Sequence, residues 1–165
     1  MRILIVTTGL LFCARLAHGQ SWELEGHGSY ARTTQSHQNS WGAGALVAGT
    51  WGGKSAPVQL GMSVGGDWRA QENNGPTQWS VSWEPTIQPG GSHALTPYAG
   101  GSFSANWLSG NNSPSGALLG LEMIFGVQFK PESQGPLSMR LEARPGYVRT
   151  QEHSVDWRFG MSWSL

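Results

Sequence analysis

Charged side chains occupy every second position in two short runs of the last third of the sequence. From Arg140 to Arg144, and again at Asp156 and Arg158, they alternate with uncharged residues. Residues two apart lie on the same face of a strand, so each run would form a column of charges. Such columns are suited to ion pairing, and a gated ion path is the functional alternative. Six residues make up the predicted network: Glu122, Arg140, Glu142, Arg144, Asp156 and Arg158.

The histidines do not have the spacing of a metal site. His27, His37, His93 and His153 are scattered, and the sequence has one cysteine, Cys13. No pair of histidines fits a helical zinc motif. We therefore expect no metal and no other cofactor, and we expect the last three histidines to be solvated in connections.

A glycine-rich stretch at residues 61–66 is similar to a phosphate-binding loop only in composition. It lacks the Lys-Ser/Thr ending of such loops, and no helical pattern follows it. The small residues are better explained as room for Arg and Glu side chains inside the fold.

The segments that must position these charges alternate with period two. From Val155 to Leu165 every odd position is apolar and no even position is. A helix would place those odd positions on opposite faces, so the segment is a strand. The same test, with Ile124 as an exception in its segment, predicts eight strands at about 22–30, 41–51, 58–68, 79–87, 95–107, 119–129, 137–147 and 155–165.

Turn-forming residues separate these segments. A unit of about 10 strand residues and about 8 connecting residues is typical of a membrane barrel.

Three prolines fall within the predicted strands. We expect Pro97 near a strand start, Pro145 near a strand end, and a bulge or early strand end at Pro85, because proline cannot donate to a ladder. The predicted longer connections are 33–40, 70–78, 108–116 and 149–154.

Length and composition exclude several classes of protein. The 165 residues allow one domain, and 12% charged residues is half of the usual ~25%. The formal net charge is zero, which argues against nucleic-acid binding. The 24 glycines and 9 tryptophans favour strands and tight turns over helices.

Residues 1–19 have the pattern of a secretory signal peptide. Arg2 precedes an apolar run that is too short to span a bilayer as a helix, and we place the cleavage after Gly19. A lipoprotein is not favoured, because Phe12 rather than a small residue precedes Cys13. The mature domain would comprise residues 20–165.

Alternation alone does not decide which face is outside. A soluble exported barrel that binds a ligand would turn its apolar face inward, whereas a membrane barrel turns it outward. The tryptophans decide, since they are too bulky for the interior of eight strands and fall near both ends of the strands, as interface girdles do. The predicted interface aromatics are Trp41, Trp51, Trp68, Trp79, Trp107 and Trp163.

The end of the chain resembles an assembly signal of small outer-membrane barrels. Arg158 to Leu165 follows the pattern polar, x, Gly, x, x, aromatic, x, apolar, with Gly160, Trp163 and Leu165 at its defined positions. The sequence therefore resembles the eight-stranded OmpA/OmpX-like family, although Leu165 stands where that family usually has Phe. The resemblance implies an antiparallel up-and-down transmembrane β-barrel, surrounded by outer-membrane lipid and inserted by the barrel-assembly machinery.

An enzymatic alternative comes from a related barrel family. Outer-membrane lipid A deacylases are similar in size and strand number, and carry His-x-Ser-Asn with a downstream acid. Here His27-Gly28-Ser29 is followed by Tyr30 and lies in the first strand, away from where that family places its motif. His153-Ser154 lacks the intervening residue, although Glu142 or Asp156 could serve as the acid.

The sequence as a whole predicts an all-β, integral outer-membrane barrel with a structural or interaction role. We expect no catalysis, a lumen plugged by charged side chains, both termini in the periplasm, and a monomer. The lipid A deacylase and the soluble ligand-binding barrel are the alternatives.

Overall fold

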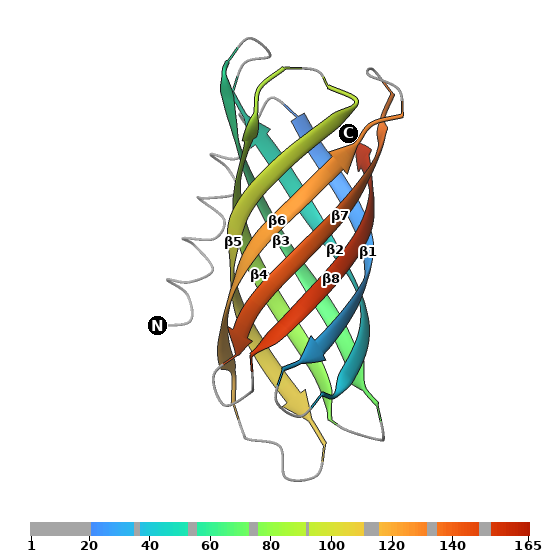
Figure 1. The fold of residues 1–165 in the computed structure, drawn as a ribbon, viewed down its shortest axis with the longest axis vertical. Helices are drawn as coiled ribbons and strands as arrows, with labels where there is room; N and C mark the ends of the chain where they lie inside the picture. The colour runs from blue at the N-terminus through green and yellow to red at the C-terminus, as the bar shows by residue number, and fades with distance from the viewer. Residues whose placement is uncertain are drawn as a thin grey trace.

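The protein is a closed β-barrel (Figure 1), as the sequence predicts. The structure, a computed structural model, describes residues 21–34, 37–52, 56–72, 76–91, 93–110, 116–131, 135–148 and 153–165. The predicted signal peptide lies outside these residues. The strands are β1 (Ser21–Thr33), β2 (Asn39–Trp51), β3 (Val58–Gln71), β4 (Thr77–Pro89), β5 (Leu95–Ser109), β6 (Leu118–Phe129), β7 (Leu137–Val148) and β8 (Ser154–Ser164).

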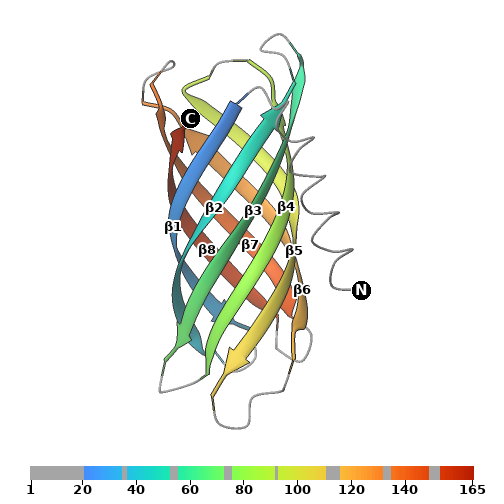
Figure 2. The ribbon, with the colours of Figure 1, turned by 180° about the vertical axis from the view of Figure 1, so that it is seen from behind.

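Each strand pairs antiparallel with its neighbours in the sequence, and β1 closes the barrel against β8. Glu23 is in register with Ser164, and the Leu165 N–H donates to the Trp22 carbonyl at 2.9 Å. The start of β1 and the end of β8 therefore share one end of the barrel, which we call the terminal rim. Figures 1 and 2 show the tilted strands running from this rim to the opposite rim.

Every strand except β8 is longer than the sequence pattern indicates. The lengths range from 11 residues in β8 to 15 in β5. The opposite rim carries connections 34–38, 72–76, 110–117 and 149–153, and the terminal rim carries 52–57, 90–94 and 130–136. Longer connections were predicted at 33–40, 70–78, 108–116 and 149–154. The prediction holds for 110–117 but was wrong for the other three, because backbone pairing continues into residues that lack apolar alternation.

Two of the three prolines, Pro85 and Pro145, lie at gaps in the ladders. Pro97 lies near the start of β5, as predicted. The expected bulge or early strand end at Pro85 is absent, since β4 continues to Pro89 with unchanged register. The β4–β5 ladder instead skips Glu84 and Pro85, and the β6–β7 ladder likewise skips Pro145 near the end of β7. A missing N–H is thus absorbed by one local gap.

Apolar side chains point outward and polar side chains point inward. Phe125 is 54% exposed and Leu119 is 67% exposed, whereas Arg144 is fully buried. Ile124, the exception to the alternation, points inward and is also fully buried. The described residues contain no helix long and apolar enough to cross a membrane.

Candidate functional site

Arg144 is the centre of the charged lumen. Its side chain, on β7, reaches carboxylates on three strands: Glu84 on β4 at 2.7 Å, Glu122 on β6 at 2.9 Å and Glu142 on β7 at 3.0 Å. Each of its three guanidinium nitrogens faces a different carboxylate. Because the group is fully buried, these charge-assisted hydrogen bonds replace its hydration.

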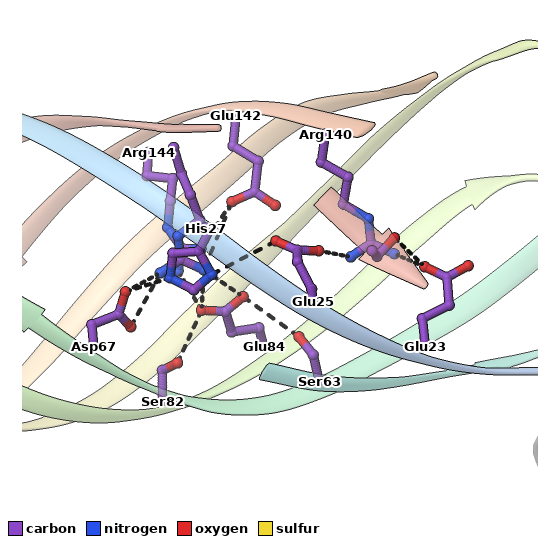
Figure 3. Close-up of polar contacts among 12 residues, drawn as sticks. Glu23, Glu25, His27, Ser63, Asp67, Ser82, Glu84, Arg140, Glu142 and Arg144 are labelled. Carbon is purple, nitrogen blue, oxygen red and sulfur yellow. Dashed lines mark hydrogen bonds and ion pairs between the residues drawn. The ribbon is translucent and has the colours of Figure 1, made fainter. Parts of the chain in front are cut away.

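Arg158 extends this cluster across the lumen toward β1 and β3. Its guanidinium lies 3.2 Å from Glu84 and 3.2 Å from Asp67, and the Asp67 carboxylate lies 2.6 Å from His27 Nε2. Figure 3 shows the side chains of His27, Asp67, Glu84 and Arg144 close together. We call this set the central cluster: His27, Asp67, Glu84, Glu122, Glu142, Arg144 and Arg158.

A second cluster lies nearer the terminal rim. Arg140 contacts Glu23 at 2.8 Å and Glu25 at 3.1 Å, both on β1. Its guanidinium carbon also lies 5.7 Å from the centre of the Tyr98 ring, within the range of a cation–π contact. Lys130, at the rim itself, lies 3.7 Å from Glu23.

Asp156 pairs with a residue that is not its neighbour in the sheet. It lies on β8 beside Arg144 in register, yet its ion-pair partner is Arg69 on β3. The structure thus joins Glu122, Glu142, Arg144 and Arg158, and places Arg140 and Asp156 in separate pairs. The partners outside the predicted network are Glu23, Glu25, Asp67, Arg69 and Glu84. Each of them stands at a polar position in the alternation of its strand, so the sequence predicts that it faces inward. Nothing in the sequence predicts which residues pair across the lumen.

Two small cavities lie among the described residues of the lumen. A cavity of about 20 Å³ lies beside Arg140 and Tyr98, and another of about 10 Å³ lies beside Arg69 and Asn106. Each volume is close to that needed by one water molecule. The central cluster lies between them and spans the lumen from β1 and β3 to β7.

Glycine makes room for the inward side chains. The Tyr98 hydroxyl donates to Glu142 at 2.6 Å, and its ring lies over Gly126, where an added Cβ would overlap it. At Gly44 an added Cβ would lie 2.6 Å from His27 and 2.8 Å from Asp67. Side chains at these positions would displace members of the clusters.

Gly126→Ala is therefore expected to destabilise the barrel by about 1–3 kcal/mol, since overpacking would move Tyr98 away from Glu142. Urea unfolding in lipid vesicles measures this change. Gly101→Ala is the matched control, because its Cβ would meet nothing closer than 3.7 Å. Equal stability of the two variants would show that the Tyr98 contact has no energetic weight.

The interface aromatics gather at the two rims. Near the opposite rim, Trp79 is in register with Trp68 on β3 and with Trp107 on β5. Trp41 lies close by on β2. Near the terminal rim, Trp51 packs edge-on against Trp22 with ring centres 6.4 Å apart, and Trp163 is 55% exposed on β8. These side chains form two aromatic bands on the outer surface.

The residues of the terminal motif lie on both faces of β8. Gly160 is buried and faces the lumen, where an added Cβ would overlap Glu25. Trp163 and Leu165 point outward at the terminal rim, and both are exposed. A role in assembly stays a prediction.

The histidine motif of the enzymatic alternative faces the lumen. His27 is held by Asp67 in the central cluster, and Ser29 is buried on the same face of β1. Neither side chain reaches the outer surface, where lipid acyl chains would lie. His37, His93 and His153 are exposed, and no group of His, Cys, Asp and Glu suited to a metal ion occurs in the described part of the chain.

The fold is shared with solved barrels. The chain is similar to Neisserial surface protein A (NspA), at 15% identity over 86% of this chain and 96% of that chain, with a TM-score of 0.61. It is also similar to the outer membrane enzyme PagL, at 12% identity over 84% and 98%, with a TM-score of 0.57. A de novo designed transmembrane β-barrel matches at 14% identity over 89% and 97%, with a TM-score of 0.54.

No protein-family model and no curated protein sequence matches the chain. At these identities the structural matches show the fold alone. The class of protein is therefore a closed, eight-stranded, antiparallel β-barrel of the kind found in small outer-membrane proteins.

Proposed function

We propose that the protein is an integral outer-membrane barrel with a structural or interaction role and no catalytic activity of its own. It is exported by its cleaved signal peptide, with the terminal rim in the periplasm and the opposite rim at the cell surface. The central cluster plugs the lumen, so the barrel is not a continuous pore.

The distribution of side chains between the two faces carries this proposal. Outward residues such as Phe125, Phe159 and Met161 are about half exposed, while the inward face carries paired charges. A soluble barrel would expose the charges to water and bury the apolar residues. Between the two aromatic bands, lipid is the environment that satisfies this outer surface.

The expected partners follow from the same geometry. The apolar face is suited to outer-membrane lipid, and Gly160, Trp163 and Leu165 form the proposed signal for the barrel-assembly machinery. Because β1 pairs with β8, no strand edge is left open for pairing with a second copy. We infer a monomer.

Cell fractionation with a gel comparison of boiled and unboiled protein tests the proposal. We expect the protein in the outer membrane, migrating faster before boiling because the closed barrel resists detergent. A periplasmic protein without a shift would favour the soluble ligand-binding alternative.

The absence of catalysis is tested separately. If the barrel is not a lipid A deacylase, expression of the parent protein and of the His27→Ala/Ser29→Ala variant should leave lipid A acylation equally unchanged. Mass spectrometry of extracted lipid A measures this. Acyl loss with the parent but not with the variant would establish the enzymatic alternative.

A further inference from the structure

A hollow of about 490 Å³ opens at the opposite rim, where β1 meets β8. Tyr30 and Trp157 are cross-strand partners in its wall. Arg32 and Val155 are the next pair toward the opposite rim. Thr33, Thr34 and His37, at and beyond the end of β1, complete the lining. The hollow therefore combines an aromatic and apolar wall with basic side chains.

Arg32 differs from the other cations of the described chain. Arg69, Arg140, Arg144, Arg158 and Lys130 all form ion pairs. Arg32 is exposed and has no carboxylate partner among the described residues, and none of the described residues lining the hollow is acidic. A guanidinium beside the apolar surface has five donors available to an anion.

Hydrogen bonds across the seam between β1 and β8 hold the hollow in shape. The N–H and the hydroxyl of Thr34 both donate to the His153 carbonyl, at 2.9 Å and 3.0 Å. The Thr33 N–H donates to the Gln38 carbonyl at 3.0 Å. These bonds tie the β1–β2 connection to the start of β8 and so fix His37 and Arg32 on the same side of the seam.

A track without side chains continues from the hollow toward the middle of the barrel. The outward positions after Tyr30 on β1 are Gly28 and Gly26, in register with Ala43 and Ala45 on β2. A Cβ at Gly26 would meet nothing within 4 Å, and one at Gly28 would meet only backbone at 3.9 Å. Phe159 and Met161 on β8, in register with these glycines, stand along one side of the track and are exposed.

We propose that this surface binds a phosphorylated, acylated lipid, with its phosphate at Arg32 and His37 and an acyl chain along Gly28 and Gly26. The site rests on the proposed function, which places the opposite rim in the outer leaflet. Two features of β1 support this proposal. Arg32 supplies charge for a phosphate, and the glycine track leaves space free of side chains beside the exposed apolar residues Phe159 and Met161.

Native mass spectrometry of the full barrel, released from neutral detergent, tests the phosphate part. The probes are phosphatidic acid and phosphatidylcholine with the same acyl chains. We expect phosphatidic acid to bind about tenfold more tightly than phosphatidylcholine, and Arg32→Gln to remove this preference. Lys130→Gln, which removes a cation at the terminal rim, is the matched control and should keep it.

Leucine substitution tests the acyl part. Gly26→Leu should weaken binding of long-chain phosphatidic acid about tenfold and leave the six-carbon form unaffected. Gly101→Leu, at a position on β5 where an added Cβ would make only an ordinary contact at 3.7 Å, should change neither. Equal effects of the two leucines would overturn the acyl track.

The remaining outcomes each overturn part of the proposal. If inorganic phosphate binds the parent as tightly as long-chain phosphatidic acid, the acyl chain adds nothing, and the ligand is a free anion and not a lipid. If phosphatidic acid binds the parent no better than phosphatidylcholine, whose phosphate is a diester neutralised by choline, the site does not recognise an anionic phosphate. A heat-shifting outer-membrane barrel with that result keeps the proposed function, whereas a periplasmic location would overturn the function independently of the binding data.

Discussion

Arg144→Ala is expected to lower the free energy of unfolding by about 3–5 kcal/mol, the range for removing one partner of a buried ion pair. Glu84, Glu122 and Glu142 would each lose a charge-assisted contact of 2.7 to 3.0 Å. The carboxylates would remain close together in a lumen that their side chains cannot leave. Urea unfolding of the barrel in lipid vesicles measures the change.

Two companion variants separate the lost pairing from the lost side chain. Arg32→Ala removes an exposed arginine and should change stability by no more than about 0.5 kcal/mol. Glu122→Gln, introduced into the Arg144→Ala background, should recover part of the loss, because Arg144 is the only ion-pair partner of Glu122 among the described residues and its charge would otherwise stay unpaired. An Arg144→Ala barrel as stable as the parent would show that the central cluster does not stabilise the lumen.

The strands and their two faces could be predicted because the alternation of apolar and polar residues along a strand is a local property of the sequence. Once Val155 to Leu165 is a strand, the inward position of Asp156 and Arg158 follows, and the structure buries both. The same rule places Ile124 inside despite its apolar side chain. Eight segments with this pattern, and tryptophans at both ends, were enough to predict a closed barrel.

Pairing across the lumen could not be predicted in this way. The height at which two inward side chains meet depends on strand tilt and on the stagger accumulated around the closed barrel. Asp156 is adjacent to Arg144 and two residues from Arg158, yet it pairs with Arg69 on β3. Glu84 likewise becomes a shared partner of Arg144 and Arg158 only because the barrel closes.

Strand ends were also beyond the pattern. Backbone hydrogen bonds extend β1 to Thr33 and β3 to Gln71, past the last alternating apolar residues. Pro85 did not end β4, because the register is the same on both sides of it and the β4–β5 ladder loses only the pairs of Glu84 and Pro85. Cooperative pairing with two neighbours thus outweighs the preference of a single residue.

Phe125→Arg is expected to cost about 2–4 kcal/mol or to abolish assembly, the range for a basic side chain at the middle of the lipid-facing surface. Phe125 lies midway along β6, points outward and is 54% exposed. In lipid, the guanidinium there would be far from either headgroup region. Vesicle refolding in urea, together with the fraction of heat-shifted protein, measures the effect.

The position dependence of this cost distinguishes lipid from water around the barrel. Leu119, at the start of β6 near the opposite rim, is 67% exposed, and Leu119→Arg should cost only about 0–1 kcal/mol because its charge can reach the interface. If water surrounded the barrel, both arginines would be hydrated and both substitutions nearly neutral. A large cost at Phe125 with a small one at Leu119 therefore requires a hydrocarbon layer centred on the barrel, whereas two small costs would contradict a membrane location.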